Sequence, residues 1–132
     1  MTPTDSAIAR RLRVQCERFG WMGGMLTTDG ERVMESNPEG WPRFAGDEMF
    51  TPPGERAYVD PHDPATVGCF AAMARRATGR RLYAVPTIDG DAWQVCEPAS
   101  FGENEPAETA ADGSFGHATE IEAWLAVLEA TP

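Results

Sequence analysis

His62 is the side chain best suited to acid–base or metal chemistry. It lies in the run Asp60-Pro61-His62-Asp63, which sets one imidazole beside two carboxylates. Such groups bind zinc or exchange protons in catalysis, but either function needs further ligands or a nucleophile from elsewhere in the chain. The sequence signals none, and both carboxylates also suit a turn and a helix start. The alternative hypothesis is therefore an enzyme whose site lies near His62 and residues 36–62. Such an enzyme would be a hydrolase or a nucleotide-modifying protein.

The other histidine, His117, follows Gly116 just before an expected helix and is interpreted as a turn residue. The chain contains no GxSxG, HExxH or P-loop motif, the patterns that carry a nucleophile, a zinc pair or a phosphate cradle. We therefore expect no catalytic residue and no cofactor.

The cysteines, Cys16, Cys69 and Cys96, lie far apart in expected helices and strands. They form no CxxC pair and no spacing with histidine that is typical of a metal site. Cysteines among apolar neighbours are usually buried. We expect three buried free thiols and no bound metal.

A cluster of four arginines gathers where an expected helix ends: Arg75, Arg76, Arg80 and Arg81. An anion bound there would face the negative end of the helix dipole. Charge compensation with the acidic segment 98–113 is the favoured role.

Acidic residues dominate the last part of the chain. The formal net charge is −10, yet residues 1–81 hold all eleven arginines and eleven acids, whereas residues 82–132 hold ten acids and no basic residue. Nucleic-acid binding depends on cationic side chains that replace counterions, so direct nucleic-acid binding is not expected. The acidic part favours a protein partner with a basic or nucleic-acid-binding surface, although net charge can also serve solubility alone. The acids expected to contact this partner are Asp89, Asp91, Glu103, Glu105, Glu108 and Asp112.

Residues 59–81 predict the helix around which the chain is organised. Asp63 suits the N-cap, Pro64 the first helical position and Gly79 a left-handed C-cap. An apolar stripe at helical spacing indicates one buried face. It comprises Val67, Phe70, Ala71, Ala74 and Thr78, widened by Cys69 and Met73.

Two further helices are predicted. The first spans about 5–19 and ends at Gly20, with an apolar line of Ile8, Leu12, Cys16 and Phe19. The last opens at Thr119, where Glu122 completes a capping box. Its buried stripe comprises Ile121, Trp124, Leu125 and Leu128.

Asp29-Gly30 predicts a β-hairpin, because both central residues of a type I′ turn need positive φ. Strands at 24–28 and 31–35 then place Leu26 opposite Val33 and Met25 opposite Met34.

Asp89-Gly90 predicts a second hairpin. It pairs Ala84 with Val95 and Pro86 with Trp93. Proline donates no ladder hydrogen bond, so its strand is expected at a sheet edge, and Trp93 is expected to be buried like Trp124.

The remaining segments are expected to be mainly loops. Residues 36–62 predict a long loop whose aromatics either pack as a lid over the core or form an exposed contact patch. These aromatics are Trp41, Phe44, Phe50 and Tyr58. Residues 98–113 predict an acidic loop, and 114–116 a short third strand.

The predicted fold is α+β: a small antiparallel sheet built from two Asp-Gly hairpins, with about three packed helices, in one domain spanning 1–132. No apolar run approaches the roughly 18 residues of a membrane span, and the first residues show no signal-peptide pattern. A cytoplasmic protein without membrane contact is expected.

Short motifs from residue 63 onward resemble a viral family. They are Asp63-Pro64 with Cys69, then Trp93-Gln94-Val95, then His117-Ala118-Thr119-Glu120 with Glu122-Ala123 and Leu128-Glu129-Ala130. The pattern is similar to small uncharacterised phage and prophage proteins, in particular the phage α-β-α sandwich domain, whose final Thr-x-x-Glu-Ala helix closes on a short sheet. The hairpin at 24–35 and the acidic segment 98–113 depart from it. The resemblance implies a viral accessory protein in the cytoplasm of a host bacterium, and it brings no catalytic residues.

Charge and resemblance together predict a phage-type accessory protein that acts by binding. The favoured function is inhibition of a host or defence protein, as anti-CRISPR proteins do, through an acidic surface. Besides the enzyme, the alternative is a phage structural or assembly protein. The oligomeric state is left open.

Overall fold

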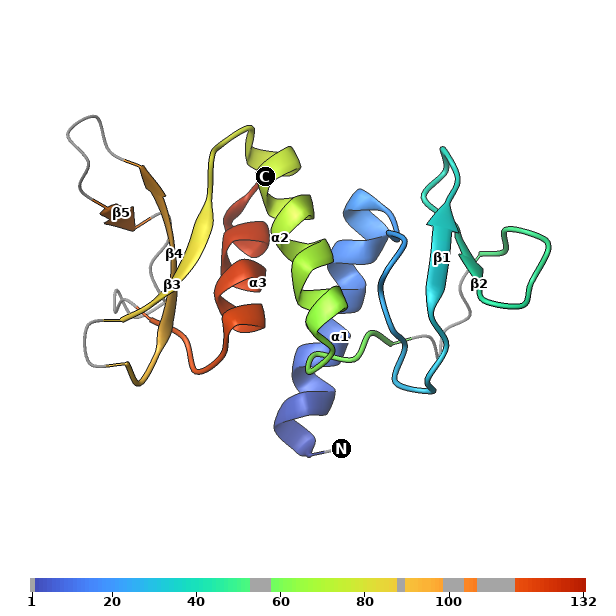
Figure 1. Ribbon diagram of the computed structural model, residues 1–132, viewed down its shortest axis with the longest axis horizontal. Coiled ribbons are helices and arrows are strands. Elements are labelled where there is room, and N and C mark those ends of the chain that lie inside the picture. Colours follow the sequence, from blue (N-terminus) through green and yellow to red (C-terminus); the bar gives the residue numbers. More distant parts are fainter. Residues whose placement is uncertain (1, 53–57, 88–89, 99–103, 107–115) are drawn as a thin grey trace. The chain divides into compact units, whose positions relative to one another are not determined.

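The computed structural model describes residues 2–52, 58–87, 90–98, 104–106 and 116–132. It divides into two compact units, Met1–Cys69 and Phe70–Pro132, and the boundary falls within helix α2 (Pro64–Thr78). The element order is α-β-β-α-β-β-β-α, and the fold class is α+β, as predicted (Figure 1). Two of the strands, β2 (Pro42–Phe44) and β5 (Asn104–Pro106), lie in segments predicted to be loops. The described strands form two antiparallel sheets rather than one. A single domain stays a prediction.

Helix α1 (Pro3–Phe19) opens the first unit. Its N-cap is Thr2, whose hydroxyl accepts from the backbone N–H of Asp5 at 3.0 Å, satisfying one of the free N–H groups of the first turn. Gly20 ends the helix with a positive φ of 93°, and its N–H donates to the Cys16 carbonyl. The predicted stripe is confirmed except at Phe19, which is half-buried; the buried residues are Ile8, Ala9, Leu12, Gln15 and Cys16.

The turn at Asp29-Gly30 is wider than predicted. The Thr27 N–H donates to the Glu31 carbonyl at 2.8 Å, and the Thr27 hydroxyl accepts from the Glu31 N–H at 3.0 Å. These bonds close a loop over 28–30, so Leu26 bridges Arg32 instead of the predicted Val33. The register predicted for this hairpin is therefore wrong by one residue, and residues 24–28 carry only isolated bridges.

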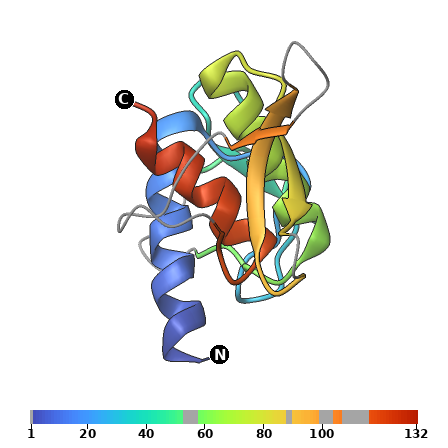
Figure 2. The same ribbon diagram turned by 90° about the vertical axis from the view of Figure 1, so that its left-hand side faces the viewer.

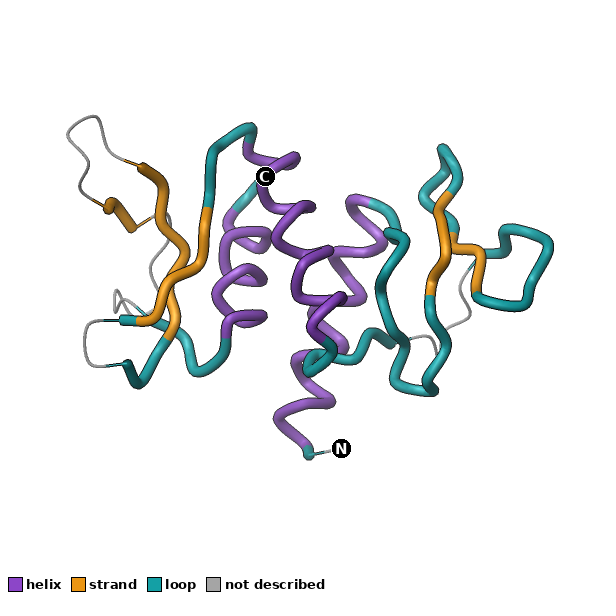
Figure 3. Tube along the Cα trace, in the orientation of Figure 1, coloured by secondary structure: helices purple, strands orange, loops and turns teal. Residues whose placement is uncertain are grey.

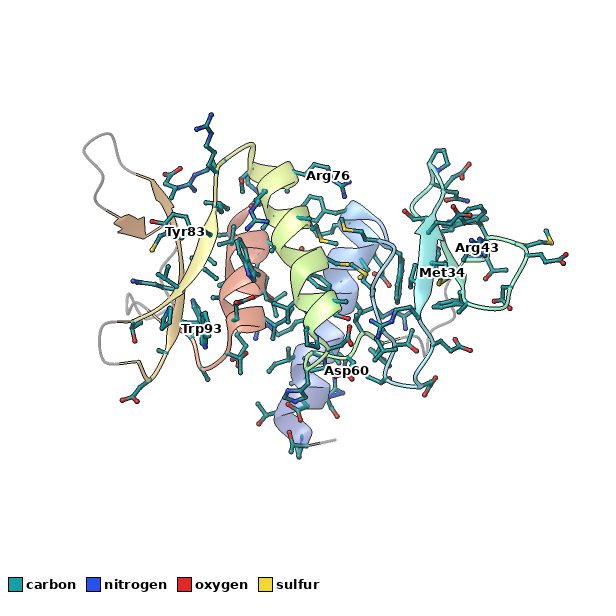
Figure 4. The ribbon with its side chains drawn as sticks, in the orientation of Figure 1. Met34, Arg43, Asp60, Arg76, Tyr83 and Trp93 are labelled. Atoms are coloured by element: carbon teal, nitrogen blue, oxygen red, sulfur yellow. The ribbon has the colours of Figure 1, made fainter. Side chains whose placement is uncertain are left out.

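The first sheet instead pairs β1 (Val33–Ser36) with β2 (Pro42–Phe44). The prediction of an unbroken loop over 36–62 is therefore wrong at β2. Asn37 closes the connection, since its side-chain oxygen accepts from the Trp41 N–H at 2.9 Å. Met34 occupies an irregularity in the ladder, and Figure 4 labels it on β1, with Arg43 labelled on β2. From β2 to α2 the described chain is loop (Figure 3).

Asp63 caps α2 as predicted. Its carboxylate accepts from the Thr66 N–H at 2.9 Å and pairs with Arg32 at 2.7 Å, and the Arg32 guanidinium beside it lowers the pKa of this carboxyl. The Thr66 hydroxyl accepts from the Leu26 N–H at 2.9 Å. The helix start is thereby fixed to the chain that precedes β1.

The rest of α2 also agrees with its predicted pattern. Gly79 follows the helix with φ 68°, and its N–H donates to the Arg75 carbonyl at 2.9 Å. The fully buried members of the stripe are Cys69, Phe70, Ala71, Met73 and Ala74, whereas Val67 and Thr78 are half-buried. Arginines and Ala72 occupy the exposed side.

The second unit contains a sheet in the order β3-β4-β5, formed by Tyr83–Pro86, Trp93–Pro98 and Asn104–Pro106. Ala84 pairs with Val95 and Pro86 with Trp93, which confirms the predicted register and the edge position of proline. Asp89, half of the predicted turn, lies outside the described residues. Figure 4 shows Tyr83 and Trp93 on this sheet. Trp93, predicted to be buried, is only half-buried, because it begins β4 opposite an exposed proline.

Strand β5 falls in the segment predicted to be an acidic loop, and the loop prediction is wrong there. It pairs with β4 through Cys96 opposite Pro106 and Glu97 opposite Glu105. Of the predicted third strand at 114–116, only Gly116 lies within the described residues. His117 beside it bridges Trp93 by two backbone hydrogen bonds of 2.7 Å.

Helix α3 (Glu120–Ala130) starts at the predicted Thr119 cap, whose hydroxyl donates to the Glu122 carboxylate at 2.8 Å. The helix lies against β3 and β4 (Figure 2). The predicted stripe is confirmed; the buried residues are Ile121, Ala123, Trp124, Leu125, Val127 and Leu128. None of the helices in the described part of the chain is long and apolar enough to cross a membrane.

Candidate functional site

Only one of the six acids predicted to contact a partner has a described side chain. Asp91 is exposed at the tip of the β3–β4 hairpin. Glu105 has its backbone in β5, opposite Glu97. Glu103, Glu108, Asp112 and Asp89 lie outside the described residues. The predicted acidic surface therefore stays a prediction.

The second unit contains both the acidic stretch and the arginine cluster. Arg80 pairs through two guanidinium nitrogens with Glu97 of β4, and this carboxylate raises the pKa of the arginine. Arg75 donates to the Leu82 carbonyl at 2.8 Å and lies 5.2 Å from the Trp124 ring. Glu97 therefore compensates Arg80, but it precedes the segment 98–113 for which compensation was predicted, and that prediction stays untested. Asp91 and Glu129 are exposed.

His62 forms a surface pair with the first helix. Its Nε2 lies 2.9 Å from Asp5 Oδ1, and the imidazole is 65% exposed. The hydrogen bond from His62 is the main cause that lowers the pKa of the Asp5 carboxyl. The His62 backbone N–H donates to Asp60 at 2.9 Å, which is the predicted turn role of that aspartate. The imidazole and the carboxylate form the kind of pair that can exchange a proton, but the His62 side chain is open to solvent, whereas that of Asp5 is 18% exposed.

Replacing His62 by alanine, and separately His117 by alanine, is expected to leave the biological effect nearly intact, because binding needs no proton transfer. The measurement is that effect, compared with partner binding, for variants whose melting temperature is unchanged. If either variant lost about a hundredfold of the biological effect but still bound the partner, the enzyme hypothesis would be favoured. A general acid or base contributes a factor of about that size to a catalysed rate.

The three thiols are buried and free, as predicted. Burial raises the pKa of Cys16, Cys69 and Cys96. The Cys16 thiol contacts Met25, with 3.8 Å between the sulfurs. A neutral thiol is a poor nucleophile and a poor metal ligand, so these residues serve packing. In the part of the chain that the structure describes, no group of three or more histidine, cysteine or acidic side chains is arranged to hold a metal.

The described residues of the first unit line at least two cavities. One of about 200 Å³ is lined by Ser6, Ala9, Arg10 and Tyr58. Another, of about 210 Å³, is lined by two tryptophans, two glutamates, Gly20 and Gly40, with Cys16 beneath. We call it the Trp41 pocket, after its exposed wall.

The Trp41 pocket was not predicted as a site. Trp41 is 40% exposed, which fits the contact-patch interpretation of the loop aromatics, whereas Phe44, Phe50 and Tyr58 are half-buried. Glu39 and Trp41 flank a glycine in the sequence. This short sequence pattern does not by itself indicate a pocket, because the rest of the lining, including Cys16 and Glu17, comes from α1.

Comparison of the chain with protein families, with curated proteins and with solved structures finds no match in any of the three.

Proposed function

We propose that this protein acts by binding a protein partner that has a basic or nucleic-acid-binding surface, and that it inhibits that partner in the cytoplasm of a host bacterium. Such a function is that of a phage accessory protein of the anti-CRISPR kind. The observation that carries the proposal is the stretch from residue 82 to 132, which holds ten acids and no lysine or arginine.

Charge of one sign over a surface steers a partner of opposite sign and raises the association rate. The described part of the second unit supports this role in one respect. Two of its four arginines, Arg80 and Arg75, contact Glu97 and Trp124 of the same unit, and Asp91 and Glu129 are exposed. An acidic surface of this kind competes with phosphates for a basic groove, because both neutralise the same cationic side chains.

The proposal predicts that charge in the acidic stretch, rather than total charge, sets the association rate. The test variant replaces Glu103, Glu105 and Glu108 by glutamine and Asp112 by asparagine. The matched control removes four exposed acids of the first unit: Asp29→Asn, Glu31→Gln, Asp47→Asn and Glu48→Gln. Both variants change the net charge by the same amount.

The partner is first captured from bacterial lysate, and association rates are then measured at low and physiological salt. We expect the test variant to associate about tenfold more slowly at low salt, with a shallower salt dependence, and the control to stay near the wild-type rate. Melting temperatures show whether either variant has lost its fold. Equal slowing of both variants would mean that net charge alone acts, and no slowing of the test variant would exclude its four acids from the contact.

A further inference from the structure

The Trp41 pocket is formed by a close backbone contact between two glycines. A Cβ on Gly40 would lie 2.8 Å from the Gly20 Cα, and both residues have positive φ, 93° for Gly20 and 82° for Gly40. The Trp21 N–H donates to the Gly40 carbonyl at 2.9 Å. These contacts hold the turn between β1 and β2 against the end of α1.

Two tryptophans are among the residues that line this pocket. Trp21 is 4% exposed, and its ring meets Phe44 edge to face with 6.4 Å between centroids. Trp41 is 40% exposed, and its backbone N–H is held by Asn37 at 2.9 Å. The pocket therefore has a fixed inner wall and an outer aromatic face that solvent reaches.

The charged groups of the pocket are both carboxylates. Glu39 is exposed, and it forms no ion pair with any residue that the structure describes. Glu17 is 60% exposed and pairs with Arg13 at 3.3 Å along α1, so its charge is partly offset. Aromatic faces and carboxylates both attract cations and both repel anions.

We propose that the Trp41 pocket receives an arginine side chain of the basic partner; this inference rests on the proposed function for the partner's identity. Guanidinium stacks on tryptophan and forms paired hydrogen bonds with carboxylates, and it is more weakly hydrated than an ammonium group. The pocket volume is about 210 Å³, far above the roughly 10–15 Å³ of cavity volume that one water needs. This is enough for a guanidinium and part of its methylene stem.

The test uses small probes and needs no partner. Nα-acetyl-arginine methylamide is titrated into the full chain, and Nα-acetyl-citrulline methylamide serves as its uncharged counterpart of the same shape. The readout is the NMR signal of the Trp41 indole N–H, assigned by its loss in Trp41→Phe. We expect the arginine probe to bind about tenfold more tightly than the citrulline probe.

Three variants locate the contact. Glu39→Gln is expected to remove most of the preference for the arginine probe. Trp41→Ala lacks the indole signal, so its binding is followed by the backbone N–H signal of Gly40, which also lines the pocket, and it is expected to weaken both probes. Glu48→Gln, an exposed acid outside the pocket, is expected to change neither.

Equal affinity for the two probes, or no response of the Trp41 signal to the arginine probe in the wild-type chain, would overturn the inference whatever the variants do. A shift that persists unchanged in Glu39→Gln would overturn the role of that carboxylate. These results are separate from the proposed function, because a pocket that binds the arginine probe decides nothing about residues 82–132. Likewise, if replacing the acids of residues 82–132 does not slow association, the binding of the arginine probe to the Trp41 pocket is unaffected by that result.

Discussion

Replacing Trp124 by alanine is expected to lower the free energy of unfolding by about 3–5 kcal/mol, the usual cost of truncating a large buried aromatic. Trp124 is 1% exposed. Its ring lies among the buried stripe of α3, and the Arg75 guanidinium lies 5.2 Å from its centroid. Alanine leaves a cavity and removes this cation–π contact. Urea unfolding followed by circular dichroism measures the change.

Trp124→Phe is the matched control. The indole Nε1 is buried and finds no hydrogen-bond partner in the described part of the chain, so losing this N–H removes no described bond. Phenylalanine should therefore cost clearly less than alanine. A folded Trp124→Ala protein with an almost unchanged unfolding midpoint would show that α3 does not bury this face.

Replacing Gly40 by alanine is expected to destabilise the first unit by about 2–5 kcal/mol. Roughly 1–2 kcal/mol comes from the left-handed backbone, and about 1–3 kcal/mol from forcing a methyl group into packed atoms. The new Cβ would lie 2.8 Å from the Gly20 Cα, a backbone atom that cannot rotate away. The same unfolding measurement applies.

Gly46→Ala separates the two contributions. Gly46 has φ +90°, close to the 82° of Gly40, but a Cβ there meets no described atom within 4 Å. It should cost only the conformational part, about 1–2 kcal/mol. Equal losses for the two variants would mean that the turn moves freely away from α1, and the geometry of the Trp41 pocket would then be wrong.

The helices could be predicted from the sequence because their signals are local. Thr119 with Glu122, and Asp63 with Pro64, mark helix starts within four residues, and the structure contains both caps. The buried stripes follow the same short periodicity. The pairing of Ala84 with Val95 was also predictable, since alternation on both strands fixes one register.

The first sheet was less predictable because side-chain and long-range contacts decide it. The Thr27 hydroxyl accepts a hydrogen bond from the Glu31 N–H, and the hairpin register is shifted by one residue from the predicted one. Strand β2 has only three residues, and it begins with a proline. No alternation is visible at that length, so its pairing with β1 depends on the Asn37 turn. Both glycines of the Trp41 pocket are visible in the sequence, but their contact across twenty residues is not.

The central claim is that this protein binds its partner by charge, and the salt dependence of the wild-type association rate tests it most directly. Exposed charges are screened beyond about 8 Å at physiological ionic strength and beyond about 3 Å at 1 M. For the captured partner, we predict that the association rate falls by about tenfold or more between roughly 0.05 M and 0.5 M salt, while the dissociation rate changes much less. An association rate that stays constant over this range would contradict the account.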